Sequence, residues 1–427
     1  MTPPRRGVLE HQQDRRIQRR RPHGRRPTTQ ASHLGRPSPP DLVLAEAQGH
    51  RIRDVDGREY LDFAMGWCVA NLGWEPEDVR DRVRSYDGPS YVPPHYTYDG
   101  WEELSGRLCR IAPGRMDACY RATGGTEAVE IALQAAMAAT GRSRFVTLDG
   151  AYHGNSVLTH TLAGPEARKH FGDRLPNVRQ VKPPLDGEAL ADVERLLQRE
   201  DVAAFVMEPV VTGLGGLVPE KEFLEGVAEA CSDTGTLLVL DEVASGFGRT
   251  GRMFATEHFG VEPDIVTLAK ALTSGVAPLG ATLLSGEVAE AVEGELSVYS
   301  TYGWHPLGVE AALGTLDVWD REGDRILENV RARGIELGHR LQRIPFGEDA
   351  KRTGIGLVHG VQVGEQARRI ADGCRDEGLL LAPSGGELHF FPALTIDGPT
   401  LREGLDILDD VTRSVLEAPA NRRRRRA

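Results

Sequence analysis

The sequence predicts an α/β protein with two domains, a large one built around a mainly parallel sheet and a smaller α+β one built from both ends of the chain. Between about residues 75 and 315, helix-like stretches alternate with short, apolar, β-branched runs. Fully apolar strands separated by helices are typical of a parallel sheet that is covered on both faces. The segment before this region has the pattern of a hairpin, and the segment after it has the pattern of amphipathic helices and short strands. With 427 residues the chain is long enough for two domains.

A hairpin is expected at the start of the folded region. Residues 49–63 surround Asp56-Gly57, a dipeptide that favours a tight turn. Four apolar runs further along are the clearest strands of the parallel sheet: Phe145–Leu148, Ala203–Met207, Leu237–Leu240 and Ile265–Leu268. The C-terminal region is expected to hold a long amphipathic helix, two short strands and a last helix, at about 316–341, 355–363, 379–381 and 399–417.

The charge is distributed unevenly along the chain. Residues 1–37 carry a net charge of +8 and residues 421–427 carry +5, so that, with −12 overall, residues 38–420 carry about −25. An acidic body argues against nucleic acid as a partner. The basic ends contain few apolar residues, so we expect disordered tails there, with nucleic-acid arms or targeting signals as the alternatives. Between the tails, the expected divisions are 38–74 and 316–420 for the small domain and 75–315 for the large domain.

Neither a membrane span nor a secretory signal is expected. No apolar stretch approaches the ~20 residues of a membrane span, and no signal-peptide apolar region follows Met1. The five cysteines, at positions 68, 109, 119, 231 and 374, show no paired spacing. An odd, unpatterned set fits free thiols in a reducing cytoplasm, where we expect the protein, and gives no metal-ligand pattern. We therefore expect neither a membrane nor a metal as a partner.

Lys270 and Asp241 are the strongest candidates for catalysis. The chain has five lysines against 46 arginines, and among the lysines Lys270 alone follows a strand that looks buried. Asp241, 29 positions upstream, ends another such strand. Because ligands of open α/β sheets bind at the carboxyl ends of the strands, we expect both side chains at one site. An amine there can form a Schiff base with pyridoxal phosphate while a carboxylate keeps the pyridine nitrogen protonated; a structural ion pair is the alternative.

A second candidate feature is Gly124-Gly125-Thr126, which precedes a strong helix. The glycines let the backbone approach a ligand, and the start of the helix offers free N–H groups and the positive end of a dipole. This combination suits a phosphate group. A Gly-Gly-Thr run before a helix is also an ordinary N-cap, and that alternative stays open.

The remaining candidates also follow predicted strands. Tyr152 could lay its ring on a flat cofactor, or it could be an aromatic residue at the edge of the core. Glu208 is a strand-end carboxylate that could serve the site or pair with an arginine. Asp241 is costly to bury unless it meets a positive partner, which a pyridinium nitrogen would be. Val243 could then pack on the ring face opposite Tyr152.

In combination, these segments resemble the class III, fold type I, pyridoxal-phosphate-dependent aminotransferases, the group with ornithine, 4-aminobutyrate and ω-amino acid:pyruvate enzymes. The resemblance covers about residues 42–415 and rests on a spaced series: Gly125–Ala128, Tyr152–Gly154, Glu208-Pro209, Asp241–Val243, Gly246–Gly251 and Lys270. It implies the fold type I architecture. It also assigns roles: Lys270 binds the cofactor aldehyde and moves the proton, and Asp241 pairs with the ring nitrogen. The other cofactor-binding residues that we expect are Gly124, Gly125 and Thr126 at the phosphate, Tyr152 and Val243 at the ring, and Glu208.

The resemblance implies an activity and a partner. An ω-amine or amino acid gives up its amino group and a 2-oxo acid then takes it, in a ping-pong sequence. An aminomutase, racemase or decarboxylase on the same scaffold is the alternative, because fold and cofactor do not settle the reaction type. Ser300–Pro306 matches the family segment in which a threonine reaches the phosphate in the partner subunit. This match implies a homodimer with shared active sites, to which Thr301 contributes.

The sequence departs from the family on the substrate side. Ala244 stands three places after Asp241, where many relatives carry a glutamine that touches the cofactor's ring oxygen. His389 and Ala382 stand where relatives carry arginines that bind a substrate carboxylate. A bidentate arginine–carboxylate clamp is strong and hard to replace. We therefore expect a substrate that lacks an α-carboxylate or binds it otherwise, and Arg249 is a candidate substitute.

Two further segments bear on the substrate pocket. Gly66–Val69 resembles the stretch of ω-amine and β-alanine:pyruvate enzymes in which an aromatic residue lines that pocket, so Trp67 is expected there, with His389 as a further pocket residue. Leu381–Glu387 instead resembles the matching segment of glutamate-1-semialdehyde aminomutases.

Overall fold

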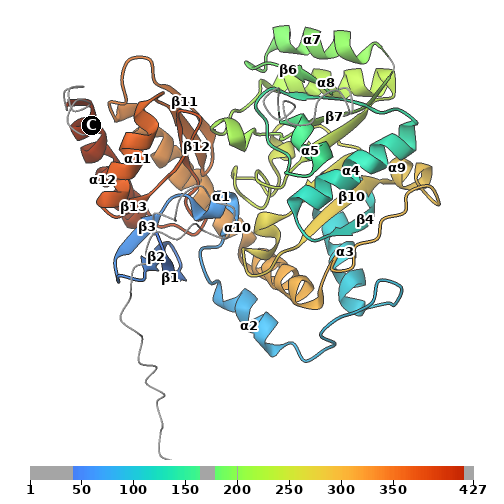
Figure 1. The fold of residues 1–427 in the computed structure, drawn as a ribbon, viewed down its shortest axis with the longest axis horizontal. Coiled ribbons are helices and arrows are strands. Elements are labelled where there is room, and N and C mark those ends of the chain that lie inside the picture. Colours follow the sequence, from blue (N-terminus) through green and yellow to red (C-terminus); the bar gives the residue numbers. More distant parts are fainter. Residues whose placement is uncertain (1–41, 164–177, 200, 418–427) are drawn as a thin grey trace, which may run out of the picture.

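The computed structural model describes residues 42–163, 178–199 and 201–417. Figure 1 shows two lobes, a larger one around a seven-stranded sheet and a smaller one with two four-stranded sheets. The long helix α10 (Pro306–Arg343) contacts elements of both lobes. The tails predicted at 1–37 and 421–427 lie outside the described residues.

The large sheet has the mainly parallel arrangement that the sequence predicts. Its strands, in spatial order, are β4 (Met116–Ala122), β10 (Gly280–Ser285), β9 (Ile265–Leu268), β8 (Leu237–Asp241), β7 (Val202–Met207), β5 (Arg144–Leu148) and β6 (Val178–Val181). Strands β9, β8, β7, β5 and β6 run parallel to one another. Only β10 is antiparallel to the strands on either side of it. The carboxyl ends of the parallel strands therefore meet at one edge.

Alternate residues of the central strands face opposite sides of the sheet. In β7, Val206 packs in an apolar cluster with α4 (Gly125–Thr140). Phe205, the residue before it, packs in a different cluster with α7 (Gly187–Leu197) and α8 (Lys221–Thr234). Because helices cover both faces, such a strand must be apolar throughout, as the sequence shows. The other helices of this lobe are α2 (Glu77–Ser85), α3 (Asp99–Ile111), α5 (Val157–Leu162) and α9 (Gly286–Ala291), with 3-10 turns η2 (Thr212–Leu214), η3 (Ala255–His258) and η4 (Lys270–Thr273).

The small lobe contains both ends of the described chain. Its first sheet has the order β1 (Leu44–Gln48), β2 (Arg51–Asp54), β3 (Glu59–Asp62) and β13 (Leu379–Leu380). The hairpin predicted over 49–63 is present as β2 and β3, and β3 pairs in parallel with β13 from the C-terminal region. The second sheet has the order β11 (Lys351–Ile355), β12 (Val358–Gln362), β15 (Glu387–Phe390) and β14 (Ala382–Ser384). Helices α11 (Gln366–Asp376) and α12 (Gly398–Glu417) complete the lobe.

Helix α10 begins ten residues earlier than the amphipathic pattern predicts. His305 caps it by accepting a hydrogen bond from the Leu307 N–H, and Pro306 occupies the first position, which proline tolerates. Its first turns are buried almost all round, from Gly308 to Leu316 with few gaps, so they show no polar face in the sequence. The division expected at 315/316 therefore falls inside one continuous helix of 38 residues.

A left-handed turn follows β3 and carries the chain toward the large lobe. The four residues of the short element α1 (Met65–Cys68), which include Trp67, have φ values of 41°, 61°, 60° and 65°. Left-handed backbone costs an L-residue about 1–2 kcal/mol, so a run of this kind needs strong local support. Asp62 supplies it: buried Oδ1 accepts from the Ala64 and Met65 N–H groups at 2.7 and 3.0 Å, and Oδ2 accepts from Trp74 Nε1 at 2.9 Å.

Replacing Asp62 by Ala should lower the thermal unfolding temperature by roughly 4–10 °C, because two backbone N–H groups and an indole N–H lose their acceptor in a strained turn. Differential scanning calorimetry of the cofactor-free protein measures the shift. Asp56→Ala, at an exposed position in the neighbouring hairpin turn, is the matched control and should stay within about 2 °C. Equal shifts for the two variants would show that Asp62 does not hold the turn.

Candidate active site

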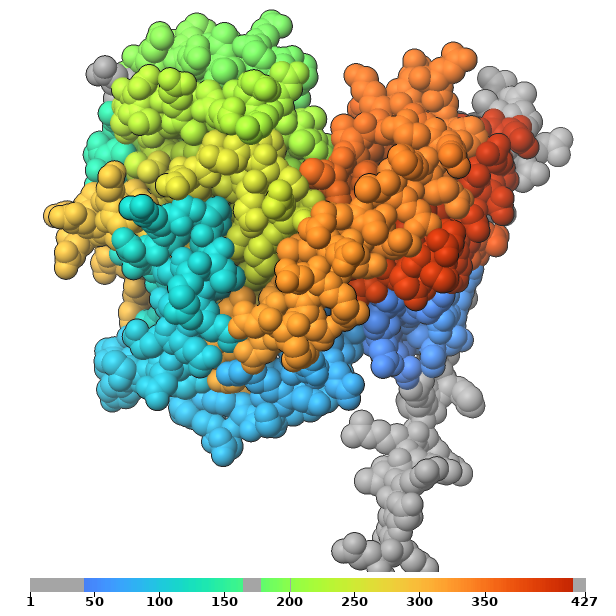
Figure 2. Space-filling model, turned by 180° about the vertical axis from the view of Figure 1, so that it is seen from behind, coloured from blue at the N-terminus to red at the C-terminus, as the bar shows by residue number. Residues whose placement is uncertain are grey.

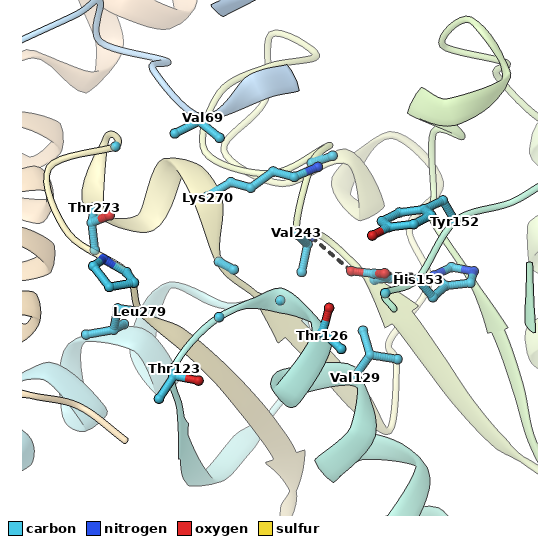
Figure 3. Close-up of a pocket in the computed structure, with 18 of the residues that line it drawn as sticks. Val69, Thr123, Thr126, Val129, Tyr152, His153, Val243, Lys270, Thr273 and Leu279 are labelled. Atoms are coloured by element: carbon cyan, nitrogen blue, oxygen red, sulfur yellow. Dashed lines mark hydrogen bonds and ion pairs between the residues drawn. The ribbon is translucent and has the colours of Figure 1, made fainter. Parts of the chain in front are cut away.

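A cavity of about 450 Å³ lies where the parallel strands end. The segments that follow β4, β5, β7, β8 and β9 all contribute to its lining, as the sequence predicts for ligands of an open α/β sheet. Figure 3 shows residues from these segments pointing into one space. The structure brings eight of the predicted site residues there: Gly124, Gly125, Thr126, Tyr152, Glu208, Asp241, Val243 and Lys270.

Asp241 is a buried carboxylate with three hydrogen bonds. Its Oδ2 lies 2.7 Å from His153 Nδ1, and its Oδ1 accepts from Thr267 Oγ1 at 2.8 Å and from the Val243 N–H at 3.1 Å. In the described part of the chain, no arginine or lysine forms an ion pair with it, so the carboxylate has no fixed positive partner. A buried acid in this state suits a ligand that brings a positive charge, such as a protonated pyridine nitrogen.

Lys270 leaves β9 through a backbone bend. Its φ is +45°, a left-handed conformation that is uncommon for a residue with a side chain, and the residue before it is fully extended. The bend ends the strand, starts η4 and directs the amine into the cavity (Figure 3). Strain of about 1–3 kcal/mol at such a position is typical of functional sites.

The start of α4 forms a close-fitting cradle on one side of the cavity. A Cβ atom on Gly125 would lie 3.0 Å from Val243 Cγ1, and a Cβ on Gly280 would lie 2.5 Å from the Gly124 carbonyl oxygen. Glu127 accepts hydrogen bonds from the Thr123 N–H and hydroxyl, which fixes the entry into the helix. The first N–H groups of a helix have no intrahelical acceptor, so the cradle offers donors and a positive dipole end to an anion such as a phosphate.

Tyr152 and Val243 supply apolar surface to the same cavity. Tyr152 is 57% exposed and lines the cavity, and its ring lies close to His153 in Figure 3. A large aromatic ring left uncovered beside a cavity is available to stack on a flat ligand. The cavity thus offers one feature for each part of pyridoxal phosphate. The N–H donors at the start of α4 suit the phosphate, the acid at the end of β8 suits the ring nitrogen, the amine after β9 suits the aldehyde, and the aromatic surface suits the ring face.

Glu208 is a second buried acid in the cavity. Its Oε1 accepts from Thr212 Oγ1 at 2.5 Å. Burial, reinforced by the negative charge of Asp241, raises the pKa of Glu208 to about 7, so this carboxyl group holds a proton readily near neutral pH.

Trp67 and His389 lie beside the cavity rather than in its lining. Trp67 is 39% exposed, and its ring centroid lies 5.0 Å from His389 and 5.5 Å from Phe391. Val69, two residues after Trp67, does line the cavity. Burial lowers the pKa of His389 to about 4, so its imidazole is neutral at physiological pH. His389 therefore cannot neutralise a substrate carboxylate as an arginine would.

The structure does not bring Arg249 or Thr301 to this cavity. Arg249 is fully buried, and its Nη1 donates to the carbonyl oxygens of Leu357 and Pro392 at 3.0 and 2.5 Å while Nη2 donates to the side chain of Asn71. These hydrogen bonds connect the Asp241–Gly251 segment to the small lobe and hold the guanidinium away from the cavity. Thr301 is exposed in the turns before α10.

Sequence reasoning missed two residues that hold Asp241. His153 was seen only as a neighbour of Tyr152, and Thr267 only as part of an apolar strand. A signal for Thr267 exists: it is the polar residue in the run Ile265–Leu268, and in the sheet it pairs with Asp241 across β8 and β9. His153 carries no such signal, because its contact depends on how the loop after β5 folds back.

The described residues contain neither a cluster that could hold a metal ion nor a helix that could span a membrane. No group of three or more His, Cys, Asp or Glu residues in that part of the chain is arranged to hold a metal ion. No helix within 42–163, 178–199 and 201–417 has both the length and the apolar character needed to cross a membrane.

The chain is similar to known aminotransferases in both sequence and structure. Residues 34–412 match the family model for class-III aminotransferases. The chain is 35% identical over 362 residues to the LysW-aminoadipate semialdehyde transaminase of Deinococcus radiodurans, covering 83% of this chain and 82% of that protein. It is 31% identical over 418 residues to an omega-aminotransferase of Caulobacter vibrioides, covering 88% and 93%. Among solved structures, a Bacillus anthracis aminotransferase superposes with a TM-score of 0.83 at 25% identity, covering 90% and 96%. The chain belongs to the class-III aminotransferase family and is a pyridoxal phosphate-dependent aminotransferase.

Proposed function

We propose that the cavity at the strand ends is the place where this enzyme transfers an amino group from an ω-amine to a 2-oxo acid, with Lys270 and Asp241 as its catalytic residues. The observation that carries the proposal is the meeting of both side chains in one cavity, the acid on β8 and the amine after β9. The cavity also contains the cradle of α4, so one bound molecule can contact all three.

Each residue then has a definite task. Pyridoxal phosphate, when bound, withdraws electrons from the substrate carbon that bears the amino group. Asp241, fixed by His153 and Thr267, would hold the positive charge of the ring nitrogen. The amine of Lys270 would hold the aldehyde end of the cofactor, and the same amine is placed to take the proton from the substrate carbon. Tyr152 and Val243 would supply apolar contacts to the ring, and Gly124, Gly125 and Thr126 would hold the phosphate.

We further propose a donor whose reacting carbon bears no carboxylate. Among the described residues of this chain, Lys270 is the one lysine or arginine in the cavity lining, and it has another task. His389 is neutral, Ala382 has no charge, and Arg249 is bound to carbonyl oxygens of the small lobe. The aromatic group of Trp67, His389 and Phe391 beside the cavity suits an uncharged distal end of the substrate.

We propose that the enzyme is a homodimer in which Thr301 reaches the phosphate bound to the partner subunit. Its exposure, away from the cavity of its own chain, supports a role across an interface. A cytoplasmic location is supported by the cysteines, all five of which are free thiols. We also propose the division into a large domain, 75–315, and a small one, 38–74 with 316–420, because β3 and β13 pair in one sheet.

The test of the function is a spectral titration of the holoenzyme with single donors and no oxo acid. The donors are a panel of ω-amines and α-amino acids. The ω-amines should bleach the visible band of the bound cofactor, and addition of a 2-oxo acid should restore the band. Bleaching by α-amino acids alone would contradict the proposed donor. A band that stays while the donor is isomerised, racemised or decarboxylated would contradict transamination.

Replacing Lys270 by Ala should remove the visible absorbance of the holoenzyme and abolish turnover, because no other lysine lines the cavity in the described structure. Far-ultraviolet circular dichroism should be unchanged. Lys182→Ala, at an exposed position, is the matched control and should keep the wild-type spectrum. A visible band that persists in the Lys270 variant would refute its role.

Replacing Thr267 by Val should weaken cofactor binding about 3- to 10-fold, because the isosteric side chain removes one hydrogen bond from Asp241. Equilibrium dialysis against pyridoxal phosphate measures the dissociation constant. Thr147→Val is the matched control: Thr147 is equally buried in a strand of the same sheet, and its hydroxyl has no partner among the described residues. If both variants bind as tightly as the wild type, Thr267 does not support the cofactor-binding acid.

Replacing Thr301 by Ala should weaken cofactor binding about tenfold in a protein that stays dimeric by sedimentation, and Thr301→Ser should restore it because the hydroxyl returns. Dimers that pair the Thr301→Ala chain with the Lys270→Ala chain identify the subunit on which Thr301 acts. In such a dimer Lys270 is intact only in the Thr301→Ala chain, and the partner chain supplies an intact Thr301 to the site of that lysine. The site that contains Lys270 should therefore bind the cofactor normally. An active monomer would rule out the shared site.

A further inference from the structure

A second cavity, here called the interlobe cavity, lies where the two lobes meet. Its volume is about 700 Å³, the size of a small-molecule pocket. Its walls come from residues 250–258 of the large lobe, from the later turns of α10 and from the turn between β11 and β12. Figure 2 shows the lobes from behind, with a furrow between the yellow chain of the large lobe and the orange chain of the small lobe. None of the residues that line the interlobe cavity lines the active site.

Close backbone contacts hold these walls together. A Cβ atom on Gly356 would lie 2.5 Å from the Thr250 carbonyl carbon and 2.7 Å from the Arg249 carbonyl oxygen. A Cβ on Gly334 of α10 would overlap the carbonyl oxygen of Gly356. The Leu357 N–H donates to the Arg249 carbonyl oxygen at 3.0 Å. Because the chains approach this closely, the three walls meet in a fixed arrangement and the cavity is built into the fold.

The interlobe cavity is lined by two arginines and by no acid. Arg252 comes from the large lobe and Arg331 from α10, and within the described residues no aspartate or glutamate belongs to the lining. Neither arginine forms an ion pair in the described part of the chain. By contrast, other arginines of the same helix do pair with acids, namely Arg321, Arg325 and Arg333. Arg331 Nη1 donates to the Gly251 carbonyl oxygen at 3.1 Å, which leaves its remaining N–H groups for another acceptor.

Two histidines in the lining carry no charge at physiological pH. Burial, and then the positive charge of Arg252, lower the pKa of His258, whose Nε2 lies 3.0 Å from Thr250 Oγ1. Burial lowers the pKa of His359 to about 4. The positive charge of the cavity therefore comes from the two guanidinium groups. Residues 38–420 carry about −25 in total, so a cavity with cations and no acid is exceptional in this protein.

This lining suits one chemical class of ligand. A guanidinium group binds the oxygen atoms of a carboxylate or a phosphate through paired N–H donors. Ile335, which is 63% exposed, and Ile355 add apolar surface to the same cavity. A ligand that matches both features has at least one oxyanion group and an organic body.

We propose that the interlobe cavity binds a small organic oxyanion, a carboxylate or a phosphate, between Arg252 and Arg331. Bound there, the ligand connects the large lobe to α10 at a place where the chain has positive charge on both walls and no acid of its own between them. It also contacts the end of the Asp241–Gly251 segment, which begins at the proposed catalytic acid. The site is separate from the proposed function and does not depend on it.

The test is isothermal titration calorimetry of the enzyme loaded with pyridoxal phosphate, because loading keeps the probes out of the phosphate cradle of α4. The probes are citrate for carboxylates and inorganic pyrophosphate for phosphates. At least one of them should bind saturably, with one site per chain, and the tighter probe identifies the class of oxyanion. If neither binds saturably up to about 10 mM, the inference is wrong.

Replacing both arginines, Arg252→Ala with Arg331→Ala, should weaken binding of the tighter probe tenfold or more. The matched control is Arg110→Ala with Arg115→Ala, which removes the same charge at two exposed positions outside both cavities and should leave the affinity unchanged. Equal weakening in the two double variants would show attraction to the overall charge of the protein and would overturn the site.

A second pair of variants leaves both arginines in place, in case their removal disturbs the fold. Ile335→Glu puts a negative charge on an exposed position of the lining and should also weaken the tighter probe tenfold or more. Ile335→Gln has a similar shape without the charge and should stay within about threefold of the wild type. If Ile335→Glu binds the probe as tightly as Ile335→Gln, the probe does not occupy the interlobe cavity.

The cofactor's spectrum distinguishes this site from the active site. In the variants of Arg252, Arg331 and Ile335, the visible band and its bleaching by an amine donor should match the wild type, since none of these residues lines the active-site cavity. Loss of the band together with loss of probe binding would place the effect at the active site and contradict a separate site. If the wild type shows no transamination but still binds the probe as described, the proposed function alone fails.

Discussion

The buried carboxylate of Asp241 is the group on which the arrangement of the active-site edge depends. Its three donors come from different parts of the sheet: Thr267 from β9, His153 from the loop after β5, and the Val243 N–H from its own turn. Those contacts draw three strand ends together around one negative charge. Among the described residues, no lysine or arginine forms an ion pair with this carboxylate. A buried negative charge without such a partner is unfavourable, and a cationic ligand would stabilise it.

A second constraint connects this edge to the small lobe. The segment that begins with Asp241 ends near Arg249, whose guanidinium donates to Leu357 and Pro392 carbonyl groups and to the Asn71 side chain. A buried guanidinium needs acceptors for its N–H groups, and here two backbone carbonyls and the Asn71 side chain accept from its two terminal nitrogens. The same turn of chain thus orients the acid and fastens the two lobes together. Arg249 does not line the cavity and its terminal nitrogens are occupied by these contacts, so a basic residue close to the site in sequence is not placed to bind a substrate carboxylate.

The sequence predicts those parts of the fold in which burial produces a simple pattern of apolar residues along the chain. Strands β5, β7, β8 and β9 lie within one or two residues of the apolar runs, because covering both faces leaves no room for polar side chains. The start of α10 was predicted wrongly for the related reason that a helix buried all round has no amphipathic period. At the site, the residues on strand ends were found from position alone. His153 was not, because its role comes from the path of a loop and leaves no periodic trace.

The continuity of α10 limits how the lobes can move. One unbroken helix of 38 residues contacts η4, which begins at Lys270, and farther along contacts β11, β12 and α12 of the small lobe. A helix about 57 Å long has no loop inside it that could absorb a change of backbone angle, so a swing of one lobe against the other must bend α10 or slide it. Because the N-terminal part of α10 packs on η4, such a displacement would also move Lys270, the first residue of that turn. The relative position of the two lobes and the position of the Lys270 backbone are therefore coupled through one helix, so that a change in the first entails a change in the second.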